Sequence, residues 1–175
     1  MLEIKLFVVN AKEYVEGIWR SETVTLPTDE KEIDEVINRI TNDGENNYLA
    51  FVHETELPVQ IENTANIQQL NSALKALIEL QKEKQLSDEE IYAVVEYNLD
   101  LDEAIEALEK YEYMFVKLER GTMEELAEVL VSEHGWFDIP AELFRFIDWN
   151  LVADEILANH NDVYIANNNV AIIFW

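Results

Sequence analysis

Carboxylates are the residues of this 175-residue chain whose number and spacing indicate a chemistry. The stretch Ser87–Tyr113, SDEEIYAVVEYNLDLDEAIEALEKYEY, holds ten of them and a single cation, Lys110. Its apolar residues recur every three or four positions, which predicts two amphipathic helices with acidic outer faces. Ser87 and Glu90 have the spacing of a capping box, so we expect the first helix to begin there.

The second predicted helix carries negative charge at nucleic-acid density. Asp102, Glu103, Glu106 and Glu109 span seven residue steps, which is about 10.5 Å of helix axis or roughly 2.6 Å per charge. Duplex DNA carries one phosphate charge per ~1.7 Å of axis, and a single strand one per ~3.4 Å. The spacing therefore indicates either an ordinary solvated face or an imitation of a nucleic-acid backbone.

The whole chain shares this excess of acids. It has 37 acidic and 12 basic side chains, a formal net charge of −25, and 49% hydrophobic residues. Residues 1–61, 62–113 and 114–175 hold 13 acids with 5 bases, 13 with 4, and 11 with 3, so their net charges are −8, −9 and −8. Such a surface repels nucleic acid and anionic membrane, and it attracts basic protein clefts or cations. The hydrophobic content indicates a folded core rather than a disordered acidic tail.

The chain lacks the residues or motifs that most kinds of catalytic and metal-binding site require. The chain has no cysteine, which excludes disulfides, thiolate nucleophiles and cysteine metal sites. Its four glycines form no phosphate-binding loop, and no two of its three histidines lie four residues apart. We therefore expect no enzyme activity, no catalytic residues, no metal and no cofactor. Since neither a signal peptide nor a membrane span is evident, we expect a cytoplasmic protein.

Two other functions remain open. The segment Asn98–Glu109 matches positions 1, 3, 5, 8 and 12 of a calcium loop, although Glu103 stands where that loop needs glycine. A calcium-binding acidic protein is therefore one alternative. A hydrolase that uses a carboxylate pair is another, and a deep pocket holding two acids would reveal it.

The pattern of elements predicts an α+β fold built as an elongated chain of three small domains. The N-terminal α+β domain, residues 1–61, should contain strands at Leu2–Val9, Gly17–Leu26 and Tyr48–Glu54. It should also contain a helix that Thr28 caps after Pro27, which runs to about Ile40 and is ended by Asn42-Asp43-Gly44. The helical acidic middle domain, residues 62–113, should add a helix at Ile67–Leu80 to the two acidic helices.

The predicted C-terminal α+β domain, residues 114–175, closes on a hairpin. Its expected elements are a strand at Tyr113–Leu118, a helix from Thr122 to Glu133, one long apolar helix from Ile139 past Ile156, and strands at Val163–Ala166 and Val170–Trp175. All four tryptophans lie among apolar neighbours, and we expect them to pack in the core.

Several motifs resemble those of ArdA-type antirestriction proteins. Tyr14-x-x-Gly17-x-Trp19 followed by Leu26-Pro27 is similar to the family's N-terminal signature, although a longer Gly-rich insert that is usual before the tryptophan is missing. Glu56-Leu57-Pro58, with Ile67–Asn71 after it, resembles the entry to the family's middle domain. Ile139-Pro140 and Phe146-Ile147-Asp148-Trp149 resemble its C-terminal block. The order and spacing hold over nearly the whole chain.

This resemblance implies an elongated homodimer that mimics bent B-form DNA. Such proteins occupy the DNA groove of type I restriction-modification enzymes and carry mobile genetic elements past host restriction. The implied partners are the specificity and methylation subunits of such an enzyme, and a DNA mimic directed at another DNA-binding protein is the nearest alternative. The residues predicted to replace phosphates are Asp88, Glu89, Glu90, Glu96, Asp102, Glu103, Glu106 and Glu109, and next Glu30, Asp34, Glu124, Glu125 and Glu128.

Overall fold

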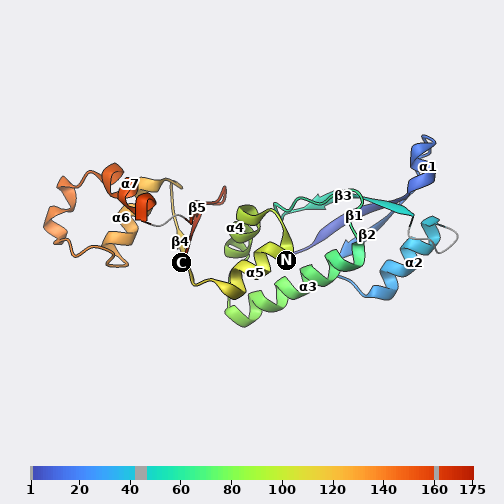
Figure 1. Cartoon of the computed structure of the whole chain (residues 1–175), viewed down its shortest axis with the longest axis horizontal. Coiled ribbons are helices and arrows are strands. Elements are labelled where there is room, and N and C mark those ends of the chain that lie inside the picture. The colour runs from blue at the N-terminus through green and yellow to red at the C-terminus, as the bar shows by residue number, and fades with distance from the viewer. Residues whose placement is uncertain (1, 42–46, 160–161) are drawn as a thin grey trace.

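Two small antiparallel sheets lie towards opposite ends of an elongated molecule, with a group of helices between them (Figure 1). The computed structural model describes residues 2–41, 47–159 and 162–175. The predicted helix end at Asn42-Asp43-Gly44 lies outside these residues. The mixture of helices and strands confirms the α+β class.

The N-terminal sheet has the strand order β2–β1–β3. Its part of the chain comprises β1 (Ile4–Asn10), α1 (Ala11–Val15), β2 (Ser21–Leu26), α2 (Glu30–Thr41) and β3 (Tyr48–Thr55). Alternate residues of β1, namely Ile4, Leu6 and Val8, are buried, and α2 contributes Ile33 and Ile40 to the same core. The inward-facing residues of the strand and the apolar side of α2 therefore pack together on one face of the sheet.

Three helices form the middle of the molecule: α3 (Ile67–Lys84), α4 (Asp88–Asn98) and α5 (Leu101–Lys110). Each begins after a residue whose side chain accepts backbone N–H bonds, respectively Asn66, Ser87 and Asp100. Both bonds of the predicted Ser87–Glu90 capping box are present. Helix α5 packs against α3 and α4. None of the described helices is long and apolar enough to cross a membrane.

The C-terminal part surrounds a sheet of order β4–β6–β5. Its elements are β4 (Tyr113–Lys117), α6 (Met123–Ser132), the 3-10 helix η1 (Ala141–Phe146), α7 (Trp149–Asn159), β5 (Val163–Ile165) and β6 (Val170–Phe174). The terminal hairpin is confirmed by the antiparallel pairing of β5 with β6.

The central strand β6 is buried along its whole length. Val170, Ile172 and Phe174 join a core that runs through α3, α4 and α5 to the N-terminal sheet. Ala171 and Ile173 belong to a second core with α6 and α7. The strand β6 thus lies between two cores and contributes to both. The division into residues 1–61, 62–113 and 114–175 stays a prediction.

The prediction of one long helix from Ile139 is wrong. Ile147 has an extended backbone (φ −76°, ψ 133°) that ends η1. The Asp148 carboxylate then accepts a hydrogen bond from the Asn150 backbone N–H (3.1 Å), and α7 begins there. The apolar residues recur at helical spacing across this break, so the periodicity of the sequence did not reveal it. Asp148 caps α7 because the backbone at Ile147 is extended and not helical.

The prediction that all four tryptophans pack in the core is also wrong. Trp136 and Trp149 pack against the second core, but Trp19 and Trp175 are 56% and 53% exposed. The Trp19 ring contacts Phe51 on the N-terminal sheet, with centroids 5.6 Å apart. The indole N–H of a tryptophan needs a hydrogen-bond acceptor, and a half-exposed ring can use water or a surface acceptor. Apolar neighbours in the sequence were therefore not sufficient to predict whether Trp19 and Trp175 are buried.

Candidate functional site

Helix α5 presents the densest row of predicted acids. Asp102, Glu103, Glu106 and Glu109 are all exposed, while the opposite side of the helix is buried. Lys110 pairs with Glu106 one turn away, and within the described residues the other three acids form no ion pair. All four lie in one regular helix, so the spacing of roughly 2.6 Å per charge along the axis holds.

The start of α5 explains why this segment is helical. One carboxylate oxygen of Asp100 accepts the backbone N–H groups of Asp102 (2.8 Å) and Glu103 (3.0 Å). Asn98 meanwhile donates its side-chain amide to the Val94 carbonyl at the end of α4. These side chains are engaged in ending one helix and beginning the next, and no cluster of three metal-ligating side chains occurs in the part of the chain that the structure describes.

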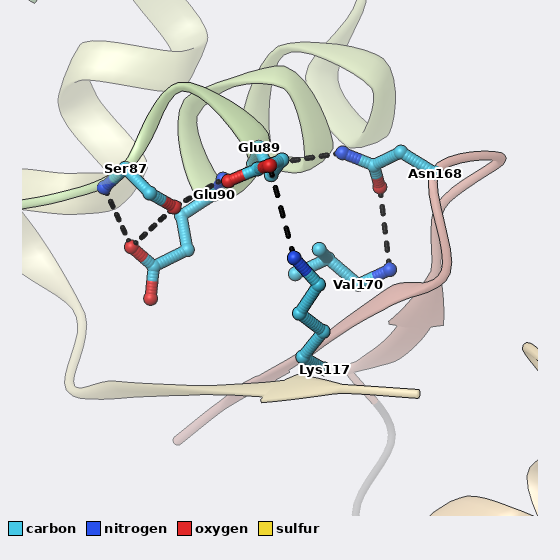
Figure 2. Close-up of polar contacts among 6 residues, drawn as sticks. All are labelled: Ser87, Glu89, Glu90, Lys117, Asn168 and Val170. Carbon is cyan, nitrogen blue, oxygen red and sulfur yellow. Dashed lines mark hydrogen bonds and ion pairs between the residues drawn. The ribbon is translucent and has the colours of Figure 1, made fainter. Parts of the chain in front are cut away.

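The first turn of α4 carries three further predicted acids. Glu90 accepts hydrogen bonds from the Ser87 backbone N–H (2.7 Å) and hydroxyl (2.9 Å), as Figure 2 shows. Asp88 is exposed and accepts a bond from Gln81 Nε2 (2.7 Å), which lowers the pKa of Asp88. Asp88 therefore remains ionised and accessible, whereas Glu90 serves mainly to cap its own helix.

Glu89 points across to the C-terminal sheet. Its carboxylate lies 3.7 Å from the Lys117 ammonium on β4, and the Glu89 side chain is still 57% exposed. An exposed pair at this distance contributes little to stability and is easily exchanged. Glu89 can therefore also contact a partner.

The remaining predicted acids extend the charge towards both ends of the molecule (Figure 1). Glu30 and Asp34 are exposed on α2. On α6, Glu128 is 49% exposed and lies 3.9 Å from Arg120, while Glu124 is half-buried. The acids of α2, α5 and α6 thus follow the long axis rather than forming one compact cluster.

The structure buries two of the predicted phosphate mimics, Glu96 and Glu125. Glu96 is 9% exposed, and its carboxylate accepts the backbone N–H of Asn167 (2.8 Å) and the Asn167 side-chain amide. Glu125 is 8% exposed and accepts the backbone N–H groups of Glu119 (2.6 Å) and Arg120 (2.7 Å). Both carboxylates are therefore occupied inside the protein.

The environment of Glu125 fixes its ionisation. Burial alone would raise the pKa of this carboxyl, but the backbone N–H bonds from Glu119 and Arg120 and the charge of Arg120 outweigh burial and lower the pKa. The Thr122 hydroxyl accepts the Glu125 backbone N–H (3.3 Å) at the start of α6, whereas the Glu125 carboxylate bonds to the residues just before that cap.

A hydrolase site finds little support among the described surfaces. An open groove of about 780 Å³ lies beside the α4–α5 connection and is lined by Glu62, Asp100 and Asp102 among others. Asp100 is already bonded to the first turn of α5. The groove therefore offers no pair of acids enclosed away from solvent.

Comparison with known proteins supplies the family. The family model described as antirestriction protein (ArdA) matches residues 6–170, a range that includes all of the described helices and extends from within β1 to the first residue of β6. No curated protein matches the chain. Because the match covers nearly the whole sequence, the chain belongs to the ArdA family of antirestriction proteins.

Proposed function

We propose that this protein is a non-enzymatic inhibitor that defeats restriction by imitating DNA. The observation that carries the proposal is the row of exposed acids on α5. Their charge density, roughly one charge per 2.6 Å of helix axis, lies between the densities of duplex and single-stranded phosphates. A rigid helix therefore presents carboxylates at intervals that suit a groove built for nucleic acid.

The proposed target is a type I restriction-modification enzyme, through the DNA groove of its specificity and methylation subunits. Lys and Arg side chains there would meet carboxylates in place of phosphates. The net charge of −25 equals that of about 42 Å of duplex DNA. The contact set that we propose is Asp88, Glu89, Glu90, Asp102, Glu103, Glu106, Glu109, Glu30, Asp34, Glu124 and Glu128.

Many weak contacts should share the binding energy. Each exposed pair contributes about 0.2–1 kcal/mol, and the field of the whole molecule should accelerate association with a basic groove. The same field opposes binding to nucleic acid or an anionic membrane. Affinity should therefore fall as salt increases.

We also propose that the working form is a homodimer in the cytoplasm, encoded on a mobile element. Phe146, Leu151 and Leu143 are 72%, 66% and 47% exposed on η1 and α7. An apolar surface of this kind supports association between protein chains. Two copies would carry a charge of −50, equivalent to about 25 base pairs. Light scattering during gel filtration should give the mass of two chains.

Restriction kinetics test the proposal. A type I enzyme would cleave unmodified target DNA in the presence of increasing protein, at several DNA concentrations. A competitive inhibitor should be overcome by excess DNA, whereas inhibition that is independent of DNA concentration would contradict mimicry. Equal inhibition of an unrelated DNA-binding protein would instead favour the alternative target.

A further inference from the structure

Buried polar side chains connect distant parts of this chain. The buried polar residues among those described are Thr41, Asn71, Glu96 and Glu125. Thr41 and Glu125 bond to atoms no more than six residues away. Asn71 and Glu96 reach partners 43 and 71 residues away. Of these two, Glu96 is the ionisable one, and its partner lies in the C-terminal hairpin.

Glu96 attaches helix α4 to the tip of that hairpin. Its carboxylate receives both the backbone N–H and the side-chain amide of Asn167, in the turn between β5 and β6. The next residue, Asn168, donates its side-chain amide to the Glu89 carbonyl (2.8 Å) and accepts the Val170 backbone N–H (3.2 Å), as Figure 2 shows. The turn is thus held to α4 at two points, at Glu89 in its first turn and at Glu96 seven residues later.

The apolar part of this junction does not by itself define one orientation. Val170, Ile172 and Phe174 pack against the middle helices, and the Tyr97 ring lies 5.5 Å from that of Phe174. Hydrophobic contact is non-directional, so small rotations of the sheet on the helices would cost little apolar area. Hydrogen bonds to a carboxylate are short and directional. They select one of these orientations.

We infer that Glu96 is a positioning residue that sets where the acids of α6 lie relative to those of α4 and α5. This inference rests on the proposed function, because the placement matters only if one partner engages both groups of acids. A partner that binds both groups of acids binds more tightly when their separation is fixed in advance. A loose junction between α4 and the hairpin would reduce this gain in affinity. Glu96 thus acts on binding without touching the partner.

Distance measurement between spin labels tests the inference without any target enzyme. The chain has no cysteine, so Ser72→Cys on α3 and Ser132→Cys on α6, both exposed, would carry the only labels. Glu96→Gln would turn an acceptor oxygen into an amide that faces the donors of Asn167. We expect the distance distribution between the labels to broaden or shift.

Glu125→Gln is the matched control, since it replaces another buried acid with the same change of charge but only local partners. It should leave the distance distribution unchanged. Glu96→Gln should also raise the concentration for half-displacement of DNA by about tenfold, a part of the 10²–10⁴ that linked contacts provide. Glu125→Gln should not.

Three results would overturn the inference: a folded Glu96→Gln variant with unchanged distances, equal changes in Glu125→Gln, or altered distances with unchanged displacement of DNA. If Glu96→Gln fails to fold, Asn167→Ala decides. It removes only the side-chain donor, and unchanged distances in that variant would reject the positioning role. If the unsubstituted protein displaces no DNA, the proposed function fails, whereas the distances still report whether Glu96 fixes the junction.

Discussion

Neutralising the acidic row of α5 should weaken binding to a restriction enzyme while preserving the fold. The perturbation replaces Asp102 with Asn and Glu103, Glu106 and Glu109 with Gln. These side chains are exposed, and the amides keep nearly the same size. Only Glu106 loses an ion pair among the described residues, the one with Lys110.

The expected loss follows from the number of contacts. At about 0.2–1 kcal/mol for each exposed pair, four contacts amount to about 2 kcal/mol. A change of 1.4 kcal/mol is tenfold in affinity, so binding should weaken about 30-fold. The loss of carboxylates near the helix N-terminus destabilises α5 slightly, and relief of repulsion between the acids opposes that loss. The melting temperature should therefore change by only a few degrees.

Displacement of labelled target duplex from a type I methyltransferase core measures this effect. The matched control changes four other exposed acids, Glu3, Glu16, Glu56 and Glu62, to Gln. It gives the same net charge but leaves the α5 row intact, and it should weaken displacement only a few-fold. An equal loss in both variants would refute the reasoning, because net charge and not the row would then determine binding.

Three further predictions concern stability and single contacts. Added monovalent salt should raise the melting temperature, because it screens repulsion among the surface acids; a flat profile from low salt to about 0.5 M would show that these charges are not crowded. Glu125→Gln should lower the melting temperature at pH 7 by about 4 °C through loss of buried charge-assisted bonds. Since the pKa of Glu125 is lowered in the folded state, its stabilisation is complete above the ordinary carboxyl pKa and disappears as the pH falls through the lowered value. The difference between the two proteins should therefore shrink below about pH 4, and a difference independent of pH would contradict the assignment. Single alanine substitutions at Asp102 or Glu109 should weaken displacement by only about twofold, and the loss of all inhibition from one such change in a folded variant would contradict a shared array.

Local patterns in the sequence were sufficient to predict α5 and its acidic face. Its apolar residues recur at helical spacing, and Asp100 begins the helix as a capping residue. The Ser87–Glu90 box predicted the start of α4 for the same reason, since both partners lie within one turn. Signals of this kind are contained in a few consecutive residues.

The burial of Glu96 depends on contacts that no local pattern contains. Helix α4 buries Ala93, Val94 and Val95 beside Glu96, because both α5 and β6 pack against it. An acidic outer face is therefore restricted to its first turn. The partner of Glu96 lies 71 residues later in the chain, so a hairpin and a helix had to be assembled before its role could be recognised.

Direct competition with DNA tests the central claim most sharply. A type I methyltransferase core would be bound to labelled target duplex and titrated with this protein at two salt concentrations. DNA mimicry predicts stoichiometric displacement that weakens at the higher salt. Retention of the duplex by the enzyme, with the protein shown to be folded, would contradict the claim.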